Sequence, residues 1–265
     1  MFTSLQTSHG CHRWARTGPL QWVGLLLGTL GAFHCWAAEV SVAVAANFTG
    51  PMEQIAPAFE QATGHKLLIA YGTVGKFYAQ IHNGAPFEVL ISADDETPIR
   101  LEKDGLAVAT TRFTYATGKL VLWSAQPGYV DSKGEVLSKG SFQHLAIANP
   151  KVAVYGAAAM DVLRSLGLDN RLAPKIVLGE NISQAHQFAA TGSAELGFVA
   201  LSQIFKDGRV TSGSSWMVPA SLYPVLRQDA VLLTKGQGSP AAQALLDYLR
   251  SDAAKRVIKS YGYDI

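Results

Sequence analysis

From residue 39 onward, apolar positions follow two periods in turn. Residues 40–44 alternate valine with smaller side chains, which predicts a strand. Residues 51–63 place apolar side chains at helical spacing, and Pro51 and Gly64 suit the start and the end of a helix. The polar segment of residues 47–50 therefore joins a predicted strand to a predicted helix.

The same strand-and-helix unit recurs along the chain. The segments that predict it are KLLIAYG with TVGKFYAQIHNG, FEVLISADD with TPIRLEKDG, HLAIANP with GAAAMDVLRSLG, and KIVLG with NISQAHQFAATG. AELGFVA and YPVLRQDAVLL predict further strands, and residues 240–262 predict one or two closing helices. Such alternation indicates an α/β fold with mainly parallel sheets flanked by helices.

The number of units exceeds what one compact sheet would hold, so we predict two lobes. No linker rich in Pro and Ser separates them, and strand-like crossovers are expected within residues 114–122 and 221–226. Residues 39–117 plus 224–265 are then lobe 1, and residues 118–223 are lobe 2. Ligands of such sheets bind at the carboxyl ends of the strands.

The start of the chain has the order of a secretory signal peptide. Arg13 and Arg16 precede the apolar run of residues 20–33, and small residues follow it. The run is short for a membrane span, which needs about 20 residues. We predict a signal peptide over residues 1–37, cleaved after Ala37, with an uncleaved anchor as the alternative. The mature protein is expected in the periplasm.

Composition limits the remaining function classes. The chain has 265 residues, 48% hydrophobic and 16% charged, which is typical of a folded protein. The formal net charge is +2, and without Arg13 and Arg16 it is zero, so no nucleic-acid partner is expected. Both cysteines, Cys11 and Cys35, fall in the predicted signal peptide. We expect a monomer without disulfides.

The search for catalytic or metal-binding motifs gives little. No serine has the context of a nucleophile elbow, and no two histidines have the spacing of zinc ligands. Asp94, Asp95 and Glu96 follow a predicted strand, and paired carboxylates could do acid–base chemistry. The same residues at a helix start cap the helix and favour its dipole. We therefore predict no enzyme and no cation site.

Four strand-to-helix joints share another property. They are Asn47, the loop Gly72-Thr73-Val74-Gly75, Tyr155-Gly156, and Asn181-Ile182-Ser183. Backbone N–H groups at a helix start lack helical partners and can bind an anion. None of the joints needs a positive side chain for this. Two joints from each lobe would therefore form a site for a small anion from dipoles and neutral hydrogen-bond donors.

These segments carry a family resemblance. VAANFTGPMEQIAPAFEQATG, YGTVGKFYAQIHNGAPFEVLISAD, FTYATGKLVLWS, AIANPKVAVYGAAAMDVL and AELGFVALSQI resemble the periplasmic molybdate-binding proteins of ABC importers. The resemblance covers residues 39–265 with the segments in the family's order. It implies a two-lobed periplasmic-binding-protein fold with the ligand in the interlobe cleft. It also implies capture of molybdate or tungstate, without a cofactor, and delivery to a membrane permease.

The resemblance implies particular oxyanion-binding residues. They are Asn47, Thr73, Val74, Tyr155 and Ile182. Two positions depart from the family's pattern. Val74 replaces the serine of a Gly-Ser-Ser-Gly loop and can offer only its N–H, with the Thr73 hydroxyl as a substitute. Ala200 stands where many members have a tyrosine, and Tyr155 is expected to replace it.

Two alternatives stay open. The departures at Val74 and Ala200 allow a ligand other than molybdate, such as sulfate, another small oxyanion or an organic acid. An exported enzyme that uses Asp94 and Asp95 is the other alternative, and it requires both carboxylates to face the cleft. A site made only of donors disfavours protonated phosphate, whose proton needs an acceptor. We therefore expect molybdate and tungstate over phosphate.

Overall fold

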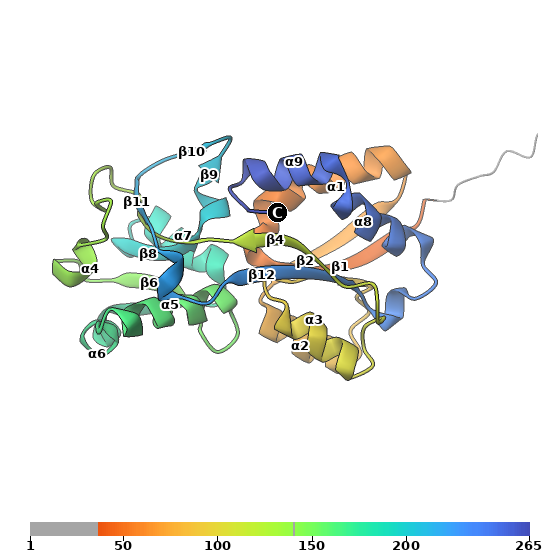
Figure 1. The fold of residues 1–265 in the computed structure, drawn as a ribbon, viewed down its shortest axis with the longest axis horizontal. Helices are drawn as coiled ribbons and strands as arrows, with labels where there is room; N and C mark the ends of the chain where they lie inside the picture. Colours follow the sequence, from red (N-terminus) through yellow and green to blue (C-terminus); the bar gives the residue numbers. More distant parts are fainter. Residues whose placement is uncertain (1–36, 140) are drawn as a thin grey trace, which may run out of the picture. The chain divides into compact units, whose positions relative to one another are not determined.

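The computed structural model describes residues 37–139 and 141–265, which form two five-stranded sheets covered by helices (Figure 1). The predicted signal peptide lies outside the described residues except for Ala37, so that prediction is not tested. Within the described ranges, no helix has the length and apolar character needed to cross a membrane.

The first sheet has the strand order β2-β1-β3-β12-β4. Its strands are β1 (Glu39–Ala45), β2 (Lys66–Gly72), β3 (Val89–Ile91), β4 (Phe113–Gly118) and β12 (Leu226–Leu232). Strand β1 pairs in parallel with β2 and β3, whereas β12 pairs antiparallel with β3 and β4. The sheet therefore combines segments from both ends of the described chain.

Helices cover both faces of this sheet. They are α1 (Thr49–Thr63), α8 (Pro240–Arg250) and α9 (Asp252–Ser260) on one face, and α2 (Val74–His82) and α3 (Glu96–Lys103) on the other. The alternation in β1 explains the two layers. Val40, Val42 and Val44 pack with the first group of helices, and Ala43 packs with the second.

The second sheet has the order β11-β5-β8-β6-β7. Its strands are β5 (Leu120–Ser124), β6 (Leu145–Ala148), β7 (Ile176–Gly179), β8 (Leu196–Ala200) and β11 (Ser214–Met217). Helix α5 (Val154–Ser165) packs on one face and α7 (Ile182–Ala190) on the other. Strand β6 is parallel to β7 and β8, and β5 is antiparallel to β8 and β11.

Short elements complete the described chain. They are α4 (Val136–Lys139), α6 (Asp169–Leu172), β9 (Phe205–Lys206), β10 (Arg209–Val210), and the 3-10 turns η1 (Ala46–Phe48), η2 (Ala173–Lys175), η3 (Leu201–Gln203), η4 (Ala220–Leu222) and η5 (Thr234–Gly236). The α/β prediction with two sheet cores is confirmed. Both sheets are mixed, because each contains one strand that follows a crossover from the other sheet and pairs antiparallel with its neighbours. This strand is β12 in the first sheet and β5 in the second. The lobe boundaries at 117/118 and 223/224 stay a prediction.

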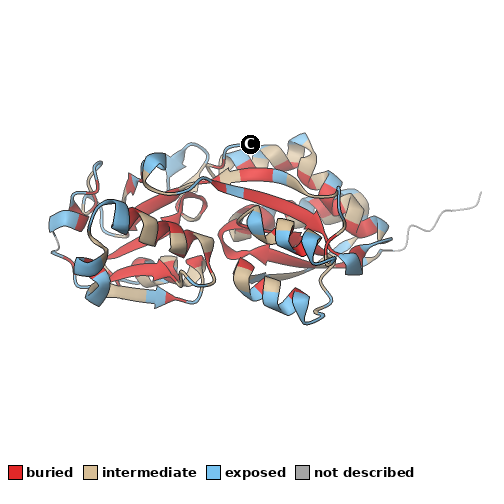
Figure 2. Ribbon diagram, turned by 60° about the horizontal axis from the view of Figure 1, so that its bottom comes forward, coloured by how far each residue is buried: buried red, intermediate tan, exposed pale blue. Residues whose placement is uncertain are grey.

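Burial follows the sheets, as Figure 2 shows: the central strands are buried, the edge strands β2 and β7 are partly exposed, and the helices expose their outer faces. The core of the second sheet also includes Ala45, Ala46, Val74 and Ala93, which lie at or just beyond the carboxyl ends of β1, β2 and β3 in the first sheet. The two sheets therefore share one continuous apolar contact at the ends of their strands.

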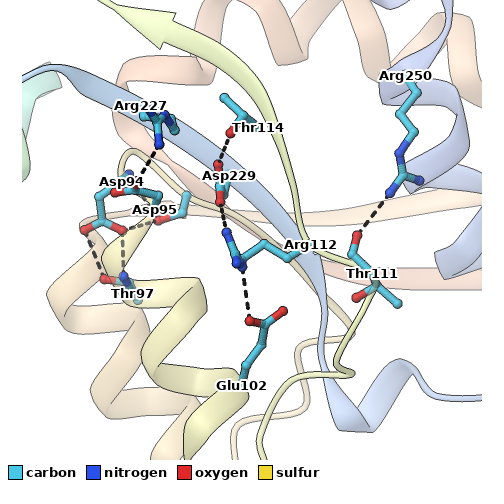
Figure 3. A network of polar contacts seen from close by, with 11 residues as sticks. Asp94, Asp95, Thr97, Glu102, Thr111, Arg112, Thr114, Arg227, Asp229 and Arg250 are labelled. Atoms are coloured by element: carbon cyan, nitrogen blue, oxygen red, sulfur yellow. Dashed lines mark hydrogen bonds and ion pairs between the residues drawn. The ribbon is translucent and has the colours of Figure 1, made fainter.

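A buried ion pair ties the edge of the first sheet to α3 (Figure 3). The Asp229 side chain is 0% exposed and accepts hydrogen bonds from Arg112 Nη1 and Thr114 Oγ1, both at 2.7 Å. Arg112 also pairs with Glu102 of α3 at 3.1 Å. The β12–β4 register shifts between Gln228 and Asp229, and such a bulge re-aims side chains.

This pair generates a stability prediction. Arg112→Leu should lower the free energy of unfolding by about 3–5 kcal/mol, because it leaves a buried carboxylate without its cation. The control Arg227→Leu should cost less than about 1 kcal/mol, since the Arg227–Asp95 pair is 3.5 Å apart and solvent-exposed. Urea unfolding followed by circular dichroism measures both, and equal losses would contradict the assignment.

Candidate functional site

All five predicted site residues line one small cavity of about 20 Å³. The lining consists of Asn47, Thr73, Val74, Tyr155 and Ile182 together with Ala45, Ala46, Gly72, Ala93, Ala153, Val154 and Asn181. This space is little more than the roughly 10–15 Å³ that one water needs. In this arrangement the cavity suits a ligand of a few atoms rather than a peptide or a sugar.

The cavity lies where four chain segments leave the carboxyl ends of parallel strands. Strand β1 leads into η1 and β2 leads into α2, while β6 and β7 precede α5 and α7. Contacts across the cavity edge join the segments of the two sheets. The Gly75 amide donates to the Val152 carbonyl at 3.2 Å, and Ser183 Oγ donates to the Ala46 carbonyl at 3.3 Å.

Helix α2 presents one free amide to the cavity. The Lys76 amide donates to Thr73 Oγ1 at 3.3 Å, and the Phe77 amide donates to the Thr73 carbonyl at 3.0 Å. The Gly75 amide is occupied by Val152. The Val74 amide has no acceptor among the described residues, so it stays available to a ligand.

Helices α5 and α7 repeat this arrangement. The amide of Gly156 donates to the Ala153 carbonyl at 3.0 Å, and the amide of Gln184 donates to Asn181 Oδ1 at 3.0 Å. Neither the Tyr155 amide nor the Ile182 amide meets an acceptor in the described ranges. Three helices therefore direct unpartnered N–H groups and positive dipole ends at one cavity, which favours an anion.

Side chains add further donors. Thr73 Oγ1 accepts from the Lys76 amide, which leaves its own hydrogen to donate. Asn181 Oδ1 likewise accepts from Gln184, and the Asn181 Nδ2 group has no partner in the part of the chain that the structure describes. Sequence reasoning did not select Asn181 as a site residue. Its position before the helix start was the available signal.

The side chain of Asn47 is engaged inside the protein. Its Nδ2 donates to Gln228 Oε1 at 3.0 Å and to the Tyr263 hydroxyl at 2.9 Å, so both amide hydrogens are used inside the protein. The Asn47 carbonyl accepts from Tyr263 and from Ser202 Oγ. The hydrogen-bond donor that Asn47 can present without breaking these bonds is its backbone N–H in η1.

Tyr155 belongs to the same buried cluster. Its hydroxyl accepts from Gln228 Nε2 at 3.0 Å, and Gln228 Oε1 also accepts from the Tyr115 hydroxyl at 3.0 Å. Burial raises the pKa of Tyr155 and Tyr115 well above the ordinary value and that of Tyr263 to about 12. All three phenols therefore keep their hydrogens at neutral pH and add no negative charge.

Carboxylates stay out of this cavity. Within the described part of the chain, no Asp or Glu lines it. Glu180 directly precedes Asn181, yet its side chain is 71% exposed and pairs with Lys76 Nζ at 3.1 Å. Ala200 does not line the cavity either, whereas Tyr155 does. A dianion here would meet donors without a competing negative charge.

A second, larger cavity of about 390 Å³ shares the wall of Val74 and Ala93 and contains Asp94 and Asp95. Asp94 caps α3, because Oδ1 accepts from the Thr97 amide at 3.0 Å and Oδ2 accepts from the Thr97 hydroxyl at 3.0 Å (Figure 3). Asp95 pairs with Arg227. The described residues hold no group of three metal-ligating side chains.

Comparison with known proteins places the chain among binding proteins. Residues 40–264 match the family model of bacterial extracellular solute-binding proteins. The molybdate-binding protein ModA of Azotobacter vinelandii is 63% identical over 229 residues, covering 86% of this chain and 91% of that protein. ModA of Rhodobacter capsulatus is 53% identical over 228 residues, covering 86% and 88%.

Solved structures of binding proteins are also similar to this chain. The periplasmic molybdate-binding protein of Azotobacter vinelandii superposes with a TM-score of 0.83 at 42% identity, covering 85% of this chain and 99% of that chain. The sulfate-binding protein SubI of Mycobacterium tuberculosis superposes with a TM-score of 0.66 at 12% identity, covering 85% and 86%, which indicates a shared fold. The predicted two-lobed fold class is confirmed by the first match.

The second cavity supplies a prediction on pH. Burial raises the pKa of the Asp94 carboxyl, while hydrogen bonds from Thr97 and Ser92 oppose the shift. Ionised Asp94 therefore costs stability that the neutral form does not. As pH rises from the ordinary aspartate pKa through the raised one, the wild-type protein should lose stability relative to Asp94→Asn. Urea unfolding across this range measures the difference, and a trend of opposite sign would contradict the assigned shift.

Proposed function

The chain belongs to the bacterial extracellular solute-binding protein family, and from this premise we propose that it captures molybdate, and also tungstate, for an ABC importer. The observation that carries this proposal is the cavity itself. Unpartnered amides of Val74, Tyr155 and Ile182 line it together with the hydroxyl of Thr73. No charged side chain lines it within the described ranges. Such a site recognises an oxyanion by neutral donors.

The energetics are consistent with a dianion. Burial removes its hydration, which is costly unless hydrogen bonds replace it. Each charge-assisted hydrogen bond contributes roughly 1.5–3 kcal/mol, and the helix N-termini add attraction. Protonated phosphate brings a hydrogen that needs an acceptor, and an unpaired one costs about 1–3 kcal/mol. The proposed order is therefore molybdate and tungstate ahead of phosphate.

Sulfate is the second candidate. It shares the tetrahedral shape and the full deprotonation of molybdate at neutral pH, so the donors alone do not separate the two. The cavity is small, and Val74 replaces a serine. Both features would reduce the preference for molybdate over sulfate. Discrimination then depends on ligand size, since oxygen positions must match the fixed amides.

The relatives also bear on cellular context. They are named as molybdate-binding proteins, and in the second cavity Asp94 holds the start of α3 while Asp95 pairs with Arg227, which are structural roles. We propose that the mature protein acts in the periplasm as a monomer, without a cofactor. Delivery of the anion to a membrane permease completes the proposed role.

Ligand class is tested by thermal unfolding of the chain from Ala38 with molybdate, tungstate, sulfate or phosphate. A ligand at 100 times its dissociation constant stabilises by about 2.7 kcal/mol, which shifts the midpoint by roughly 5–10 °C in a protein of this size. Molybdate and tungstate should give this shift and phosphate should not. No shift with any oxyanion would refute the proposal, and a sulfate shift of equal size would favour the second candidate.

The role of the Val74 amide can be tested with proline, which removes the N–H but is tolerated at the first helical position. Thr73 has an extended backbone (φ −96°, ψ 150°), as a residue before proline requires. Val74→Pro should lower molybdate affinity about tenfold or more, because one charge-assisted hydrogen bond is lost. Isothermal titration calorimetry measures the affinity.

Val74→Ala is the matched control. It keeps the N–H but removes buried methyl groups, so stability should fall by about 0.5–3 kcal/mol while affinity stays within about threefold. Equal affinities of the two variants would show that the Val74 amide does not contact the anion.

A further inference from the structure

Gln228 is a buried polar residue that lies next to the cavity wall. It is 0% exposed, lies in strand β12, and does not line the cavity. The register shift that follows it lets the next residue, Asp229, serve the separate pair with Arg112. A buried amide of this kind is costly unless each of its polar atoms has a partner.

The amide of Gln228 joins two residues of the cavity wall. Its Oε1 accepts from Asn47 Nδ2 at 3.0 Å, and its Nε2 donates to the Tyr155 hydroxyl at 3.0 Å. Asn47 follows a strand of the first sheet, and Tyr155 begins a helix of the second. Gln228 is thus a bridge between the two halves of the wall.

The direction of the bond to Tyr155 matters. A phenol oxygen that accepts from an N–H keeps one hydrogen to donate. Within the cluster, the Tyr263 hydroxyl is the acceptor in reach of that hydrogen, and it already accepts from Asn47 Nδ2 at 2.9 Å. A dianion in the cavity is a stronger acceptor than a neutral phenol.

We propose that Gln228 is a positioning residue of the oxyanion site: by donating to the Tyr155 hydroxyl, it turns the hydroxyl hydrogen toward the bound anion. The inference rests on the proposed function and adds a residue that touches no ligand. Gln228 acts through Tyr155 and holds Asn47 at the same time. Loss of the Gln228 amide should therefore weaken anion binding, although Gln228 does not contact the anion.

Gly118 provides independent support. A Cβ at this position would lie 2.1 Å from the Tyr155 hydroxyl and 2.5 Å from Gln228 Nε2. The backbone there does not adopt a positive φ, so glycine is not required by the conformation. The absent side chain leaves the space in which the Tyr155–Gln228 hydrogen bond forms.

The test compares molybdate affinity by calorimetry with the unfolding free energy of the anion-free protein. Gln228→Met should lower affinity about tenfold or more, as should Tyr155→Phe. The matched control is Tyr115→Phe, which removes another hydroxyl bonded to Gln228 Oε1 but leaves Asn47 and Tyr155 in place. It should lower stability while affinity stays within about twofold. Comparable affinity losses in Gln228→Met and Tyr115→Phe would overturn the proposal.

Gly118→Ala separates positioning from general destabilisation and avoids a buried polar deletion. In the otherwise unaltered protein it should lower affinity about tenfold, because it displaces the Tyr155 hydroxyl. In the Tyr155→Phe background the loss should be clearly smaller, since one of the two groups that the Cβ would displace, the hydroxyl, is already gone. An equal loss in both backgrounds would show that Gly118 and Gln228 act on the fold and not through Tyr155.

The outcomes also separate this inference from the proposed function. If the unaltered protein binds neither molybdate nor tungstate, the proposed function fails and takes this inference with it. If the unaltered protein binds and Gln228→Met binds equally well, only this inference fails.

Discussion

A neutral site for a buried anion depends on one constraint: the protein must occupy its own acceptors, so that donors are left for the ligand. Three of the four cavity side chains that can both donate and accept obey it, and the fourth, Asn47, uses both amide hydrogens inside the protein. Thr73 Oγ1 accepts from the Lys76 amide, Asn181 Oδ1 accepts from Gln184, and the Tyr155 oxygen accepts from Gln228. Each internal bond stabilises the fold and fixes the polarity of the cavity.

The same constraint explains why the fold and the site are hard to separate. Two of these bonds are helix caps, at the starts of α2 and α7, and they satisfy amides that a helix leaves unpaired. The free amides of Val74 and Ile182 belong to residues that line the cavity. Glu180 and Lys76 keep their charges at the outside through a mutual ion pair. The local rules of helix ends thus produce an anion site without a cationic side chain.

Much of this could be predicted from sequence. The change of apolar period at each joint located the helix starts, and the rule that ligands bind at the carboxyl ends of parallel strands brought Asn47, Val74 and Ile182 together. The direction of strand pairing was harder to predict, because β12 joins the first sheet only after the chain has formed the second sheet. Its antiparallel pairing with β3 is decided by contacts far apart in sequence.

The hydrogen bonds that hold the site residues in place could not be predicted from sequence either, for the same reason. Neither Gln228 nor Tyr263 belongs to a joint motif, and local patterns do not show what a distant side chain contacts. Three consecutive polar residues, Arg227, Gln228 and Asp229, within a predicted strand were the available signal. Asn47 lines the cavity, but its amide hydrogens serve this support, which no local pattern indicates.

The bond between Asn47 and Tyr263 joins residues 216 positions apart in sequence. Closing so long a loop is entropically unfavourable until many other contacts have formed. This hydrogen bond behind the cavity is therefore among the last contacts to form during folding, and no N-terminal fragment of the chain contains both of its residues. A nascent or unfolded chain would carry the strands and helices of the site in its sequence, but would have no pocket in which to hold an anion.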